Sequence, residues 1–189
     1  MRLEIHFRIA KKISGEIREH GYYIHEKSFL LGSLFPDLIQ SYLWRRHVYP
    51  VSRNFLRKKI ERLRKRPLFF SFQLGELTHY ICDFFCYPHS RAYDKGFFHH
   101  IKYEIRQKAP ENFTKLSLDI KNFAIEELDK FVGWYEKWRP LFQDDGHDFE
   151  IAALVSLGFL RAACECSSSD TLDQTIDMSL LHWEGQYSV

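Results

Sequence analysis

The sequence lacks any continuous apolar stretch long enough to cross a bilayer, and charged residues interrupt its first segment, MRLEIHFRIAKKI. A transmembrane helix needs about 20 predominantly apolar residues. A secretory signal needs an uninterrupted apolar core of roughly 7–15 residues. We therefore expect a cytoplasmic protein that carries neither element.

Cysteine is also scarce, with Cys82, Cys86, Cys164 and Cys166 as its four occurrences. The first two are spaced i, i+4 and the last two i, i+2, which differs from the C-x2-C pairing of structural zinc sites. Without a secretory signal, thiols are expected to stay reduced. The sequence therefore predicts ordinary buried thiols and argues against a sulfur-ligated metal site.

Net charge is small, because 27 Lys and Arg residues stand against 25 Asp and Glu residues, giving +2. No bulk field steers the chain toward polyanions, so we expect no stable nucleic-acid complex. Basic residues are concentrated locally, however, with eight Lys or Arg and one Glu in residues 53–66. This stretch is either the solvated face of a helix or a surface that holds a phosphodiester or a lipid headgroup.

Three aromatic residues, Phe69, Phe70 and Phe72, closely follow the basic stretch. They either join the core or form, with the basic residues, a rim for peripheral membrane contact. The sequence leaves both interpretations open.

Glycine and proline are few, nine and six in 189 residues, and apolar residues recur mainly at i, i+3 and i+4. This pattern predicts an all-α protein. Expected helices cover residues 3–19, about 25–35, 51–66, 69–86, 96–108, 113–138, 148–165 and 170–182. Pro36 is expected to break the second helix and leave Asp37 on a turn. The expected buried stripe of the first helix consists of Leu3, Phe7, Ala10, Ile13 and Ile17.

No linker, low-complexity tract or internal repeat divides the chain. Its length is sufficient for one domain with a sizeable core. We expect a single-domain, multi-helix bundle over residues 1–189.

Histidines and carboxylates recur at helical spacing. His79 and Asp83 are spaced i, i+4, and so are His100 and Glu104. Such residues lie on one helix face, about 5–6 Å apart at Cβ, so an imidazole nitrogen and a carboxylate oxygen can bind one ion. A single pair is more often a salt bridge or a core histidine. Two pairs 21 residues apart on consecutive predicted helices favour a metal centre.

Four further residues, His6, Asp37, His47 and His89, extend this set. Pro88 ends a predicted helix and would turn His89 back toward the bundle. The ligands offer nitrogen and oxygen but no sulfur, which suits zinc or another divalent transition metal at a hydrolytic site. Asp37 is the candidate general base, because a carboxylate on a turn can reach both a metal and a nucleophilic water. The alternative is that Asp37 is only a ligand or a turn former.

Two polar neighbours are candidates for supporting roles around the ligands. Glu76 lies one turn before His79 and either orients an imidazole or is an exposed helical glutamate. His99 adjoins His100 but points about 100° away around a helix, toward a supporting or a surface position.

These motifs, taken in order and spacing, resemble the zinc-dependent phospholipase C family, whose fold is shared with single-strand-specific fungal nucleases. The similarity covers about residues 1–110. The segments that carry it are His6, GSLFPD ending at Asp37, His47, HYICD with His79 and Asp83, His89 after a proline, and HIKYE with His100 and Glu104.

The resemblance implies a zinc cluster that hydrolyses phosphodiesters, with a lipid or nucleotide phosphoester as substrate. Two zinc ions are implied, with a third as an addition. The first would be held by Asp37, His47, His79 and Asp83. The second would be held by His89, His100 and Glu104. The third would be held by His6 and by Asp83 as a bridging carboxylate.

The chain departs from the family at the third site. There the family also uses the amino terminus of the mature chain, usually a tryptophan, more than a helical turn before the histidine. Here five residues precede His6, and none is tryptophan. A metal-binding or partner-binding module without turnover is therefore the alternative to a phosphoesterase. Phenylalanine-rich loops serve both lipid and nucleic-acid hydrolases, and nothing in the sequence specifies an oligomeric state.

Overall fold

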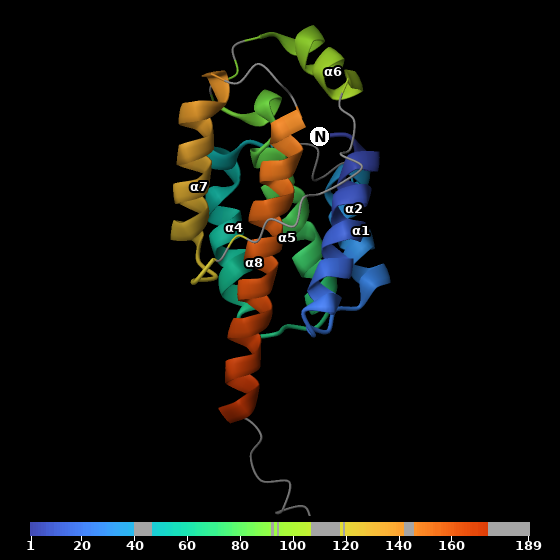
Figure 1. Ribbon diagram of the computed structural model, residues 1–189, viewed down its shortest axis with the longest axis vertical. Coiled ribbons are helices and arrows are strands. Elements are labelled where there is room, and N and C mark those ends of the chain that lie inside the picture. The colour runs from blue at the N-terminus through green and yellow to red at the C-terminus, as the bar shows by residue number, and fades with distance from the viewer. Residues whose placement is uncertain are drawn as a thin grey trace, which may run out of the picture.

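A computed structural model describes residues 1–39, 47–91, 93, 95–106, 118, 120–141 and 146–173, without the side chains of residues 97, 104, 146–147 and 167–173. These residues form an all-α bundle in which no strand occurs within the described ranges. Figure 1 shows the arrangement. The elements are α1 (Leu3–Glu19), α2 (Glu26–Leu38), α4 (Tyr49–Leu63), α5 (Phe70–Phe84), the 3-10 helix η1 (Tyr87–His89), α6 (Phe97–Arg106), α7 (Ile125–Trp138), the 3-10 helix η2 (Arg139–Leu141) and α8 (Gly146–Asp173).

Helix α5 forms the centre of the bundle and contacts α1, α2, α4 and α8. Every residue from Leu74 to Phe84 is buried. A helix buried on all sides is normally apolar all round, yet α5 carries Glu76, His79 and Asp83. Buried polar groups must find partners within the protein. The centre of the fold is therefore also where its polar chemistry is concentrated.

Helices α2 and α5 approach each other closely because two glycines face the opposing backbone. A Cβ atom at Gly32 would lie 2.0 Å from the carbonyl oxygen of Phe72, and one at Gly75 would lie 2.1 Å from that of Phe29. Real Cβ atoms do not approach backbone oxygens so closely. Any side chain at either glycine would push the two helices apart.

The second helix differs from its expected form. Pro36 lies buried inside α2, and the helix continues to Leu38, so Asp37 lies in its last turn. The expectation that Asp37 lies on a turn beyond the helix is therefore wrong. A proline removes one backbone hydrogen bond, to residue i−4. The bond lost is the one that the Gly32 carbonyl oxygen would accept, and the helix ends two residues after Pro36.

The buried face of α1 begins differently from the expected stripe. Leu3 and Phe7 are each 41% exposed, whereas Ile5, His6 and Ile9 are buried. The last three members of the expected stripe are buried as anticipated. The buried face of α1 is therefore rotated about the helix axis relative to the expected stripe, and His6 points into the bundle.

Aromatic side chains fill much of the core. The largest fully buried ones are Phe29, Tyr80, Phe84, Phe85, Phe123, Tyr135, Phe149 and Phe159. Among the helices in the described ranges, none is long and apolar enough to cross a bilayer.

The two ends of the bundle differ in content. The N-terminus, the last turns of α5 and helix α6 lie at one end, with α6 placed across it (Figure 1). The connection from α4 to α5 lies at the other end. The residues of the predicted metal centre are at the end covered by α6.

Candidate metal centre

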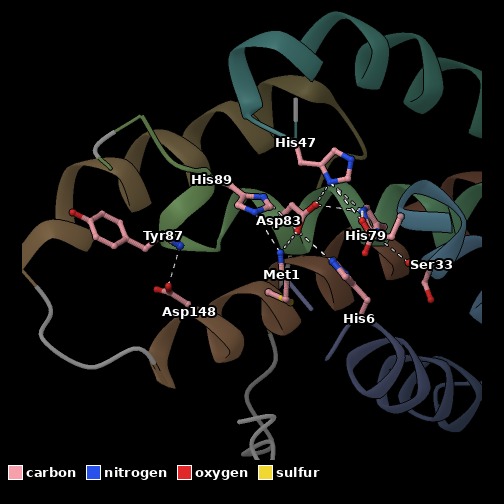
Figure 2. Close-up of polar contacts among 10 residues, drawn as sticks. Met1, His6, Ser33, His47, His79, Asp83, Tyr87, His89 and Asp148 are labelled. Carbon is pink, nitrogen blue, oxygen red and sulfur yellow. Dashed lines mark hydrogen bonds and ion pairs between the residues drawn. The ribbon is translucent and has the colours of Figure 1, made fainter. Parts of the chain in front are cut away.

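Asp83 lies at the centre of a ring of histidines (Figure 2). It is fully buried near the end of α5. Its Oδ1 lies 3.2 Å from His6 Nε2 and 3.5 Å from His89 Nδ1. Its Oδ2 lies 2.5 Å from His47 Nδ1 and 3.3 Å from His79 Nε2. The histidines come from four separate stretches of the chain, so tertiary folding is what assembles them.

Asp37 lies at the more open side of this cluster. Its Oδ1 is 3.6 Å from His79 Nε2 and 4.0 Å from His47 Nδ1. The Asp37 side chain is 24% exposed, whereas that of His79 is fully buried. Asp37 is thus the carboxylate of the cluster that faces both the histidines and solvent.

The donor atoms form overlapping groups, and within each group the atoms lie within 4.8 Å of one another. The groups are His6 with His79 and Asp83, Asp37 with His47 and His79, and His47 with Asp83 and His89. Two groups share each of the residues His47, His79 and Asp83. Ions held by these groups would therefore be close neighbours.

The spacing of the donors fits zinc coordination. Ligand atoms about 2.0–2.2 Å from a tetrahedral ion are roughly 3.3–3.6 Å from one another. The distances from Asp83 to His6, His79 and His89, and from His79 Nε2 to Asp37 Oδ1 and His47 Nδ1, lie between 3.2 and 3.6 Å. The 2.5 Å contact of His47 with Asp83 is a direct hydrogen bond instead.

Several buried nitrogens of the cluster lack hydrogen-bond partners among the described residues. They are both ring nitrogens of His6 and Nε2 of His47. Buried polar atoms are nearly always satisfied in native proteins. A neutral imidazole presents a nitrogen lone pair, which is the usual donor to a transition metal. The unsatisfied nitrogens therefore fit residues that hold metal.

The ring of His79 is oriented by a backbone contact. Its Nδ1 donates a hydrogen bond of 2.9 Å to the carbonyl oxygen of Ser33. Because a carbonyl accepts but does not donate, the proton resides on Nδ1, and in the neutral ring Nε2 keeps its lone pair. That lone pair faces Asp37 and Asp83. Such a contact to the non-ligating nitrogen is characteristic of metal-binding histidines.

Electrostatics favours neutral imidazole at His6 and ionised carboxylate at Asp83. Burial, aided by the neighbouring His79, lowers the pKa of His6 to about 3. Its ring stacks on His79 with centroids 3.9 Å apart. Burial alone would raise the pKa of Asp83, but the Met1 amino group and the surrounding histidines outweigh it and hold that pKa well below its usual range.

At the open side of the cluster, the pKa values of Asp37 and His47 are raised instead. Burial raises the pKa of the Asp37 carboxyl, which makes its carboxylate a stronger proton acceptor. Burial would lower the pKa of His47, but its hydrogen bond to Asp83 outweighs this and raises it.

Sequence reasoning did not select Met1, whose amino nitrogen lies in the same cluster. It donates to Asp83 Oδ1 at 3.0 Å and lies 3.4 Å from His89 Nε2. Helix α1 begins at Leu3, so a short extended segment carries residue 1 to the end of α5. Five residues before His6 are enough to bring the first residue to the cluster.

Of the second predicted pair, His100 and Glu104, the structure describes the side chain of His100. The ring of His100 lies against that of His89, with centroids 5.1 Å apart, so α6 brings His100 to the edge of the cluster. Glu104 is on the same helix, but its side chain lies outside the described part of the structure. Its role as a ligand stays a prediction.

The two predicted supporting residues each have a described partner outside the proposed ligand set. Glu76 is buried, and its carboxylate forms an ion pair of 2.6 Å with Lys59 of α4. His99 is exposed, and its Nδ1 lies 3.1 Å from the hydroxyl of Tyr93.

A buried carboxylate next to the cluster, Asp148 of α8, was also missed by sequence reasoning as part of the site. It accepts a hydrogen bond from the Tyr87 backbone N–H at 3.1 Å (Figure 2). It also accepts one from the Tyr103 hydroxyl and forms an ion pair with Arg139. Asp148 thus ties together η1, which ends at His89, and α6. No local spacing pattern signals such a contact, because its members lie on different helices.

Comparison with known protein families gives one match. The family model described as zinc dependent phospholipase C matches residues 5–138. A search of curated proteins and a search of solved structures each return no match. The matched range contains every predicted ligand.

Proposed function

The chain belongs to the zinc-dependent phospholipase C family, and we propose that it hydrolyses phosphodiesters at the cluster around Asp83. One observation carries this proposal. Nitrogen atoms of four histidines lie 2.5–3.5 Å from the two oxygens of the buried Asp83 carboxylate, and the donor atoms form overlapping groups that suit shared metal ligands.

The residues assigned to zinc are His6, Asp37, His47, His79, Asp83, His89, His100 and Glu104. Two ions are proposed, with a third at His6. When bound, zinc supplies Lewis acidity toward phosphoryl oxygens. Asp83 would supply negative charge to neighbouring ions, because its two oxygens face different histidines.

Asp37 is the proposed general base. A water molecule entering from solvent meets the exposed edge of its carboxylate, whose pKa is raised by burial. The carboxylate accepts one proton of that water as the water oxygen bonds to phosphorus, and the P–O bond to the leaving alcohol breaks. The oxygen of the leaving alcohol takes up a proton from solvent. His79 is held in one orientation by Ser33, so the Asp37 side of the cluster is fixed before substrate arrives.

The proposed substrate is a lipid phosphoester, in keeping with the family to which the chain belongs. A nucleotide phosphoester is the second candidate. The cluster itself recognises a phosphodiester in either case, because its ions would address phosphoryl oxygens that both substrates share.

The test is an assay of zinc-loaded protein on a chromogenic phosphodiester, on short-chain phosphatidylcholine and on single-stranded DNA. We expect hydrolysis of the phosphatidylcholine, and loss of about 100-fold or more in Asp37→Asn, as for removal of a general base. Asp129→Asn, which changes a carboxylate on α7, is the matched control and should remain active. If folded, zinc-loaded protein turns over none of the three substrates, the protein is a binding module without turnover.

A further inference from the structure

Helix α6 has an apolar stripe that faces away from the bundle. Phe98, Ile101 and Ile105 are 87%, 40% and 66% exposed. Their spacing of three and then four residues places them on one face of the helix. Tyr103, which is 3% exposed, and His100, which contacts His89, lie on roughly the opposite face. The helix therefore holds the cluster with one side and presents apolar side chains with the other.

Exposed apolar residues are ordinary when scattered, but a contiguous group marks an interaction site. Leu63 and Ile60 of α4 show the ordinary outcome, since both are buried on the inner face of that helix. Helix α6 instead uses its inner face for Tyr103 and His100. Its apolar stripe is thus left largely exposed, most of all at Phe98 and Ile105.

The described charged side chains of α6 and of the segment just before it are of one sign. The described charged side chains between residues 91 and 106 are Arg91, Lys95, Lys102 and Arg106, and all are exposed. Lys102 directly follows Ile101 on the outer side of the helix. The two acidic residues of this stretch, Asp94 and Glu104, lie outside the described side chains, and Glu104 is assigned to the metal cluster.

We propose that α6 docks on an anionic lipid surface, with Phe98, Ile101 and Ile105 inserted at the interface and the neighbouring basic residues at the headgroups. An amphipathic helix with a basic polar side binds such surfaces in this way. The inference rests on the proposed function, because it would bring the metal cluster beneath α6 to its phosphoester substrate. Binding would be reversible, since three side chains give a small buried area.

A rival surface lies at the other end of the bundle. Leu68 and Phe69, 86% and 78% exposed, precede α5, and Phe69 adopts a positive φ of 61°. Along α5 this position is roughly 21 Å from Asp83, from the rise of 1.5 Å per residue. Docking there would hold the cluster away from the lipid.

The basic helix that precedes this rival surface is also engaged within the protein. Arg53 pairs with Asp129, and Lys59 pairs with Glu76. Arg64 donates to the carbonyl oxygen of Phe123. These contacts give three of the eight basic residues partners within the protein, and they favour α6 as the docking surface.

The experiment is sedimentation of the zinc-loaded full chain with vesicles of phosphatidylcholine, with and without phosphatidylserine. We expect binding to the phosphatidylserine vesicles that weakens as salt is raised. The triple substitution Phe98→Ser, Ile101→Ser and Ile105→Ser should weaken it by about tenfold or more. The double substitution Lys102→Glu and Arg106→Glu should weaken it likewise, which gives a second reading that does not alter the apolar residues.

The matched control is the triple substitution Leu31→Ser, Leu68→Ser and Phe69→Ser, which removes exposed apolar side chains outside α6. It should keep the affinity of the unaltered protein. If the control loses binding while the α6 variants keep it, or if the unaltered protein does not bind, the proposal is overturned. It is also overturned if the α6 triple substitution abolishes self-association in solution rather than vesicle binding. Asp37→Asn should still bind vesicles, so failure of hydrolysis and failure of docking are separate results.

Discussion

His79 donates its Nδ1 hydrogen to the carbonyl oxygen of Ser33 at 2.9 Å, and this contact joins α5 to α2 beside the metal cluster. Ser33 follows Gly32, and His79 lies one turn after Gly75. The two glycines let the helix backbones approach closely. Helix packing and orientation of a proposed ligand therefore depend on the same pair of small residues.

Gly75→Ala should lower both stability and zinc affinity. Its Cβ would lie 2.1 Å from a backbone oxygen of α2, so the helices must separate and the Ser33 contact must lengthen. We expect a loss of about 1–3 kcal/mol in the free energy of unfolding, as for overpacked cores. Denaturant titration and zinc analysis measure the two effects.

The matched control for this prediction is Gly133→Ala in α7, where an added Cβ meets nothing within 4 Å. It should stabilise the protein by roughly 0.4–1 kcal/mol, because alanine has the lower conformational entropy in the unfolded chain. Equal effects of the two substitutions would contradict the packing argument.

Asp83→Asn should reduce zinc content more than Asp37→Asn does. Asp83 contacts four histidines with its two oxygens, whereas Asp37 lies near His47 and His79 with one oxygen. An amide cannot supply the charge that neutralises neighbouring ions. Elemental analysis and melting temperature with and without chelator give the comparison, and equal losses in both variants would remove Asp83 from the bridging position.

His6→Leu should separate stability from metal binding. Without bound metal, Nδ1 of the buried His6 ring has no hydrogen-bond partner among the described residues, so an apolar side chain of similar size avoids a desolvation cost of about 1–3 kcal/mol. We expect the metal-free variant to unfold at the same or a higher temperature. The further stabilisation that zinc gives to the unaltered protein should shrink. A variant that is less stable without metal but unchanged in its response to zinc would refute the assignment.

Asp129 should contribute to the loss of stability in acid. Hydrogen bonding from Arg53 lowers the pKa of the Asp129 carboxyl in the folded protein, with burial acting in the opposite direction. A group whose folded pKa is depressed stabilises the fold above its unfolded pKa of about 3.9, and that contribution is lost as pH falls through the folded value. Asp129→Asn should thus melt at a lower temperature at pH 6, and the difference should diminish below about pH 4. A difference that does not change between these pH values would contradict this linkage.

The sequence alone determined the helical class and predicted the residues of the proposed ligand set. Apolar spacing predicted the helices, because the 3.6-residue period is a local property of the chain. The i, i+4 spacing of His79 and Asp83 also fixed their common face before any tertiary contact was known. The structure brings these two residues to within 3.3 Å.

Tertiary structure decided how separate segments meet. His6, His47 and His89 reach Asp83 from different parts of the chain, and Met1 joins them. Spacing within one helix says nothing about such distances, because they depend on helix packing and on the paths between helices.

Local sequence also did not predict the partners and positions of several individual side chains. Glu76 pairs with Lys59, a partner on another helix that no local pattern indicated. Asp37 lies within α2, because a proline near a helix end need not terminate it. The apolar stripe of α6 could have been read as core from its period, since periodicity identifies an apolar face but not what covers it. Its exposure is decided by Tyr103 and His100, which turn the opposite face toward the bundle.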